Sequence, residues 1–91
     1  MISIQLPGVL RDCAGGRTEL QSDAARVADA LQGIARDNPL LRRHLFAETG
    51  GLRSHVNVYL NQDEVRDLPA GLDSPLRDGD VLLILPSIAG G

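Results

Sequence analysis

The chain has 91 residues, of which 43% are hydrophobic and 23% are charged, and this composition is typical of a small globular domain. A net charge of −3 and an aromatic content limited to Phe46 and Tyr59 argue against nucleic-acid binding, which needs a basic face and usually stacking rings. Because no apolar run approaches the ~20 residues of a membrane span and the start does not resemble a signal peptide, we expect a cytoplasmic protein with no membrane partner.

The first residues predict a β-hairpin. Residues 2–6 alternate apolar and polar side chains, which is the period-two pattern of a strand with one buried face, and a Pro-Gly pair ends them. We expect residues 11–16 to form a loop that contains a Gly-Gly turn. Residues 17–21 then predict a second strand, with Thr18 and Leu20 on one face.

The next segment predicts the main helix, over about residues 24–37. Ser22 and Asp23 are good N-cap residues at its start, and Asn38-Pro39 ends it. Apolar residues recur along this segment at helical spacing and form one stripe. The stripe consists of Val27, Ala30, Leu31, Ile34 and Ala35. We expect this stripe to pack against a sheet, where it contributes to the core.

The middle of the chain predicts a short helix or turn followed by a strand. Residues 40–46 form the helical stretch, with basic side chains on its solvent side. Residues 55–60 alternate again, which predicts a strand that carries Tyr59 on one face. The residues expected on its opposite face are Val56, Val58 and Leu60. Residues 63–66 predict a short edge strand, and residues 68–72 a connecting loop.

The end of the sequence predicts a turn, a strand and a tail. Asp78-Gly79 favours a turn, since Asp can bond its own backbone and Gly accepts a positive φ. Residues 81–85 are consecutively apolar, which is typical of a buried strand, and Pro86 ends it by removing a backbone donor. We therefore expect residues 1–86 to form one domain and residues 87–91 to form a flexible tail.

The last strand also predicts a surface for a partner. Successive side chains of a strand point to opposite faces, and we expect Leu82 and Ile84 to lie on the face away from the main helix. So small a chain has little else to cover that face, and exposed apolar patches usually mark partner sites. The expected partner interface is therefore Leu82, Ile84 and Tyr59.

The final Gly90-Gly91 pair suggests a chemical role for the terminal carboxylate. Residues without side chains can enter a narrow channel, and residues 87–91 reach roughly 17 Å when extended. A carboxylate becomes a good electrophile once ATP has converted it into an acyl-adenylate, which a sulfur or amine nucleophile can then attack. On the glycines alone, an ordinary frayed terminus is an equally open interpretation.

Two stretches of the sequence resemble the ThiS/MoaD family of ubiquitin-like sulfur carriers. The first is residues 78–91, with the sequence DGDVLLILPSIAGG, and the second is Val56–Asn61 followed by Asp63–Arg66. The likeness extends over the full chain and, within the family, is greatest to the CysO-like carriers. Periodicity alone predicts an α+β fold. The resemblance implies a β-grasp: a mixed sheet of four to five strands, with the final strand beside the first and the main helix on one face.

The resemblance also implies a function. An E1-like enzyme would adenylate Gly91 with ATP, and sulfur would replace the adenylate to give a thiocarboxylate on Gly91. The carrier would then deliver this sulfur to a biosynthetic enzyme, which for CysO-like carriers is a cysteine synthase. The tail that enters the partner's channel would be Ser87, Ile88, Ala89 and Gly90. We expect the chain to bind no metal or cofactor itself and not to be an enzyme, since it offers no nucleophile, base and oxyanion donor set.

Two alternatives stay open at this point. A MoaD-like chain would be the small subunit of molybdopterin synthase, with the large subunit as a permanent partner. A ubiquitin-like modifier would instead be joined through Gly91 to lysines of other proteins. All three roles use the same terminal carboxylate, so the residues alone do not choose among them.

Overall fold

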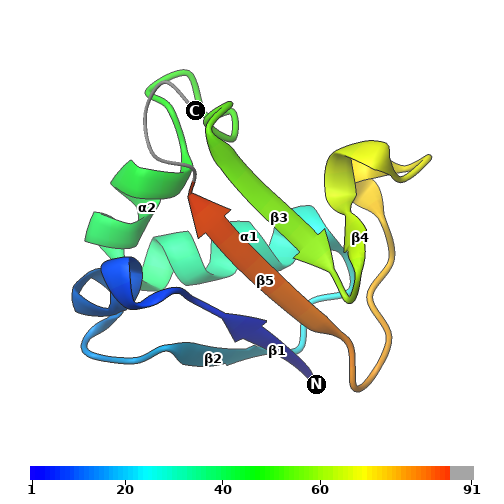
Figure 1. The fold of residues 1–91 in the computed structure, drawn as a ribbon, viewed down its shortest axis with the longest axis horizontal. Coiled ribbons are helices and arrows are strands. Elements are labelled where there is room, and N and C mark those ends of the chain that lie inside the picture. The colour runs from blue at the N-terminus through cyan, green and yellow to red at the C-terminus, as the bar shows by residue number, and fades with distance from the viewer. Residues whose placement is uncertain (87–91) are drawn as a thin grey trace.

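Five strands form one mixed sheet in the computed structural model, which describes residues 1–86 (Figure 1). The strands are β1 (Ile2–Gln5), β2 (Glu19–Ser22), β3 (Val56–Leu60), β4 (Asp63–Glu64) and β5 (Val81–Pro86). Their order across the sheet is β2-β1-β5-β3-β4. β5 is central, parallel to β1 and antiparallel to β3. The predicted placement of the final strand beside the first is therefore confirmed.

The turn before β5 has the predicted conformation and also binds the start of the chain. Gly79 has a φ of 88°, and its N–H donates to the Met1 carbonyl at 3.1 Å. The Met1 ammonium donates to the Asp78 carboxylate at 2.5 Å. This hydrogen bond, together with the attraction between the two charges, lowers the pKa of the Asp78 carboxyl. The turn thus aligns β5 with β1 from its first residue.

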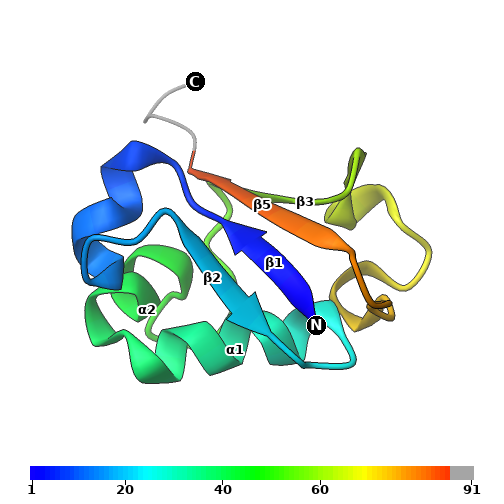
Figure 2. The same cartoon turned by 90° about the horizontal axis from the view of Figure 1, so that it is seen from below.

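Two helices cover one face of the sheet (Figure 2). They are α1 (Val27–Asp37) and α2 (Pro39–Leu45). Every residue of the predicted apolar stripe of α1 is buried. Asn38 ends α1 as predicted, and its N–H donates to the Ile34 carbonyl at 3.0 Å. The prediction of a main helix is confirmed, and the segment after it, predicted as a short helix or a turn, is a helix.

The start of α1 differs from the prediction, because the helix begins at Val27 and not near residue 24. The residues before it are extended and pair with the segment ahead of β5. The Val27 N–H donates to the Ser74 carbonyl at 3.1 Å, and the Leu76 N–H donates to the Ala25 carbonyl at 2.8 Å. Ser22 does not cap the helix, since its hydroxyl accepts a hydrogen bond from the N–H of Ala24 instead.

Within residues 1–86, three 3₁₀ helices occupy segments that were predicted, wholly or in part, as loops or as an edge strand. They are η1 (Gly8–Ala14), η2 (Val65–Asp67) and η3 (Gly71–Asp73). η1 forms because Leu10 and Ala14 turn inward and are buried. The edge strand β4 accordingly contains only two residues, and β2 begins two residues later than predicted.

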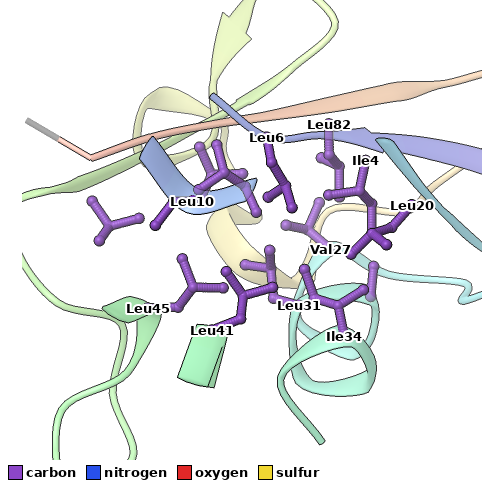
Figure 3. Close-up of a cluster of buried hydrophobic side chains, with 14 of the residues drawn as sticks. Ile4, Leu6, Leu10, Leu20, Val27, Leu31, Ile34, Leu41, Leu45 and Leu82 are labelled. Atoms are coloured by element: carbon purple, nitrogen blue, oxygen red, sulfur yellow. The ribbon is translucent and has the colours of Figure 1, made fainter. Parts of the chain in front are cut away.

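The core lies between the sheet and the helices (Figure 3). Ile4 of β1, Leu31 of α1 and Leu41 of α2 are all buried in it. Leu82 and Ile84 of β5 belong to the same cluster and are fully buried, so the prediction that they form an exposed surface is wrong. The inward face of β5 thus contributes directly to the packing that stabilises the fold.

Candidate functional site

The face of the sheet opposite the helices is formed by every second residue of the strands. Residues paired across neighbouring strands share a face, so the register defines this outer face. The pairs across its centre are Ser3 with Val81, Gln5 with Leu83, Tyr59 with Leu83, and Asn57 with Leu85. The two helices leave this face uncovered (Figure 2).

An apolar stripe runs along the middle of this face. Val81, Leu83 and Tyr59 are half-buried, and Leu85 keeps 38% of its surface exposed. We call these four residues the outer stripe. Polar residues border it on both sides, and they are Ser3, Gln5, Glu19, Gln21, Asn57 and Glu64. An exposed apolar stripe with a polar border is the usual composition of a surface that binds another protein.

The predicted interface residues are divided between the two faces of the sheet. Tyr59 lies on the outer face, as expected. Leu82 and Ile84 pair with Leu60 and Val58 on the inner face, where the core covers them. The candidate interface therefore consists of Tyr59 and the alternate β5 residues Val81, Leu83 and Leu85.

The five residues of the predicted tail, 87–91, lie outside the described residues, and so does the proposed reactive group on Gly91. The structure does show the end of β5, which directly precedes this segment in the sequence. Pro86 is the last residue of β5 and pairs with Val56, the first residue of β3. β5 and β1 are parallel, so η1, which follows β1, lies at the same end of the sheet as Pro86.

One side chain at this end of the sheet was not singled out from the sequence. The Arg66 guanidinium donates to the Val56 carbonyl at 2.8 Å, to the Arg53 carbonyl at 3.2 Å and to the Asn57 side-chain oxygen at 3.1 Å. Its Nη1 also lies 4.0 Å from the Glu64 carboxylate. The sequence signal was slight, because Arg66 is one of nine arginines and only the fold brings it to the start of β3.

In residues 1–86 we looked for a metal site and for a reactive cysteine. Within residues 1–86, no group of three or more His, Cys, Asp or Glu side chains is placed to hold a metal ion. Cys13 is half-buried and packs against the core, which is the behaviour of a small hydrophobic residue. No helix in the same part of the chain is long and apolar enough to cross a membrane.

The chain belongs to the ThiS family, whose sequence model matches residues 4–91. Among curated proteins it is similar to the sulfur carrier protein CysO of Mycobacterium tuberculosis, at 27% identity over 99% of this chain and 98% of that protein. It is 33% identical to small archaeal modifier protein 1 of Haloferax volcanii, over 90% of this chain and 91% of the relative. The resemblance to ubiquitin-like sulfur carriers is thereby confirmed.

Solved structures of similar proteins have the same fold. The CysO complex with BexX from Amycolatopsis orientalis matches with a TM-score of 0.85 and 31% identity, over 100% of both chains. Small archaeal modifier protein 1 of Methanosarcina acetivorans matches with a TM-score of 0.84 and 30% identity, over 99% of this chain and 95% of that one. The fold is therefore a ubiquitin-like β-grasp, as the resemblance to ThiS/MoaD carriers implied.

Proposed function

We propose that this chain is a sulfur carrier whose Gly91 carboxylate is adenylated by an E1-like enzyme and then converted into a thiocarboxylate. The observation that carries the proposal is the match to the ThiS family, which runs through Gly90-Gly91 to residue 91. In this fold the segment that holds those glycines continues from β5, the central strand of the sheet. A firmly paired strand therefore leads directly to the proposed reactive end.

The proposed reaction has two steps, and the partner enzyme performs both. A Gly91 carboxylate oxygen attacks the α-phosphorus of ATP and pyrophosphate leaves, which gives an acyl-adenylate. Hydrosulfide supplied by a donor then attacks the acyl carbon, and AMP and a proton leave, so that a C–S bond replaces a C–O bond and the thiocarboxylate forms. The sequence contains no phosphate-binding loop motif, which supports a role for the partner in binding ATP. The chain itself is then a carrier and not an enzyme.

We further propose that the carrier donates its sulfur to a cysteine synthase-like enzyme. Identities of 27% and 31% to two CysO proteins, each over nearly the whole chain, support this acceptor. The A. orientalis CysO forms a complex with BexX, which supports docking to a separate protein. A MoaD-like role in molybdopterin synthesis is supported by the fold alone, since the putative molybdopterin converting factor from Pyrococcus furiosus is 23% identical.

The outer stripe is the surface we propose for docking these partner enzymes. It is apolar, it lies on the face that the helices leave open, and β5 connects it to the segment that ends at Gly91. Ordering a free segment costs about 1–2 kcal/mol per backbone residue, so the folded face must supply much of the binding free energy. A single partner can therefore contact the stripe and receive residues 87–91 at once.

A ubiquitin-like modifier is the second candidate, and one observation favours it. Small archaeal modifier proteins match this chain at 33% identity in sequence and at 30% identity in structure. In this role a lysine amine would attack the acyl carbon of the adenylated Gly91, and AMP and a proton would leave, which gives an isopeptide bond. The two roles share their first step and differ in the nucleophile of the second.

Deletion of Gly91 tests the proposed chemistry. We expect the truncated chain to lose ATP–pyrophosphate exchange by the E1-like enzyme of the same organism, because the activated carboxylate is displaced by one residue. The melting temperature should stay almost unchanged, since the described core cluster lies within Ile2 to Ile84.

Val9→Ala is a matched control for this experiment. Val9 is 76% exposed, and its truncation should leave both the exchange and the melting temperature unchanged. Full exchange by the chain that lacks Gly91 would contradict the proposed function.

A further inference from the structure

The outer edge of β3 is only partly covered by a neighbouring strand. β4 pairs with β3 only at Tyr59 and Leu60, and the chain then forms η2. The backbone groups of Val56, which point toward this edge, are therefore beyond the reach of β4. An exposed strand edge with unpaired backbone groups opens more easily than a paired one.

The Arg66 side chain occupies the position that a longer β4 would have filled. It extends from η2 across the edge of β3, and its guanidinium donates to the carbonyls of Val56 and Arg53 and to the Asn57 side chain. Hydrogen bonds from a charged donor are stronger than neutral ones, and the planar guanidinium can make several at fixed angles. One side chain thus binds the first two residues of β3, Val56 and Asn57, and the segment before it at Arg53.

The start of β3 in turn holds the end of β5. The Asn61 N–H donates to the Val81 carbonyl at 2.8 Å, so this pair of opposite residues is hydrogen-bonded. In an antiparallel ladder such pairs alternate along the strand. The same pattern makes Asn57 and Leu85 a hydrogen-bonded pair, the last such pair between β3 and β5.

The alternation also explains why Pro86 and Arg66 fit their positions. Val56 and Pro86 form the next pair, which is not hydrogen-bonded, so the missing N–H of Pro86 costs no bond to β3. The Val56 backbone groups point away from β5: its N–H donates to Arg53, and its carbonyl accepts from Arg66. Arg66 therefore binds β3 from the side opposite to β5.

We propose that Arg66 is a positioning residue for the carrier reaction, because it holds the start of β3 and thereby fixes the point at which β5 ends. This inference rests on the proposed function of Gly91. With Leu85 and Pro86 paired, the five residues that follow the sheet, 87–91, reach roughly 17 Å when extended. If those two residues separate from β3, the connecting segment lengthens by roughly 7 Å. A longer connection lowers the effective concentration of the carboxylate in the partner's active site.

Amide hydrogen exchange tests the structural half of this proposal. In Arg66→Ala we expect the Leu85 and Asn57 amides to exchange about tenfold faster or more, while the Ile4 amide keeps its protection; tenfold corresponds to about 1.4 kcal/mol. Arg36→Ala removes the same charge from an exposed position of α1 and should leave the Leu85 amide unchanged.

Arg66→Lys separates charge from geometry in the same experiment. A single ammonium group cannot reach all three acceptors at the guanidinium angles, so we expect fast exchange at Leu85 in this variant too. Wild-type exchange in Arg66→Lys, or an equal acceleration at every amide of Arg66→Ala, would overturn the proposal. The first result would show that charge alone suffices, and the second that Arg66 only stabilises the whole fold.

Adenylation kinetics with the E1-like enzyme and ATP test the functional half. We expect kcat for Arg66→Ala to fall about tenfold, or about 1.4 kcal/mol, with KM changed less because the outer stripe still docks. Unchanged kcat despite faster exchange at Leu85 would overturn the proposal. A wild-type chain that is not adenylated at all would contradict the proposed function instead, and the exchange data would still decide whether Arg66 holds the end of β5.

Discussion

Leu82 and Leu85 lie in the same strand but have different surroundings. Leu82 is fully buried between the sheet and the helices, whereas Leu85 keeps 38% of its surface exposed on the opposite face. The first side chain contributes to the free energy of unfolding through its burial. The second belongs to the outer stripe, the surface proposed for partner docking.

Alanine substitutions at these two positions should therefore have different effects. Leu82→Ala is expected to lower the free energy of unfolding by about 2–5 kcal/mol, because it leaves a cavity in the core. Leu85→Ala should change it by about 0.5 kcal/mol or less and should weaken binding to the E1-like enzyme. Urea denaturation and binding titration measure the two effects. Equal losses of stability would contradict the assignment of the two faces.

The faces of β5 could not be predicted from the sequence, and the reason lies in its residues. β1 and β3 alternate apolar and polar side chains, so the inward residues of both strands were predicted correctly. Residues 81–85 are all apolar and contain no alternation that marks the buried side. Only the register with β3, which places Ile84 opposite Val58, settles the question. The contacts of Arg66 could not be predicted either, because its three acceptors come together only in the folded chain.

At the level of elements, α1 shows how local sequence and tertiary contacts share control of a helix. Its apolar stripe and its end at Asn38 follow from the residues themselves. Its start is set by the segment around Ser74–Leu76, which binds residues 25–27 through backbone hydrogen bonds. N-cap preferences at Ser22 and Asp23 are weaker than these contacts, and for that reason the predicted start was three residues early.

Gly33 in the middle of α1 offers a test at this scale. A Cβ at this position would meet no atom within 4 Å, and glycine in a helix interior costs about 0.5–1 kcal/mol relative to alanine. Gly33→Ala should therefore raise the free energy of unfolding by that amount and the melting temperature by roughly 2–8 °C. Thermal denaturation measures the change, and a lower melting temperature would contradict this account of α1.

Gly79→Ala is the matched control for this substitution. Its Cβ would also meet no atom within 4 Å, but its φ of 88° strains any residue with a side chain. We expect it to destabilise the protein by roughly 1–2 kcal/mol, so the same chemical change has opposite signs in the helix and in the turn.

For the whole molecule, the fold places two surfaces on one central strand. The inner face of β5 packs into the core, and its outer face carries the stripe proposed for partner docking. Periodicity alone predicted an α+β chain, and the resemblance to ThiS/MoaD carriers supplied the strand order that the structure confirms. The sulfur-accepting enzyme could not be predicted in the same way, because all candidate roles share the Gly-Gly end.

The most direct test of the central claim is the intact mass of the protein purified from its own host, with fragmentation of its C-terminal peptide. We predict a mass increase that equals one exchange of oxygen for sulfur, located on Gly91. A Gly91 that carries no sulfur and is found instead in isopeptide bonds to lysines of other proteins would contradict the sulfur-carrier function and support the modifier.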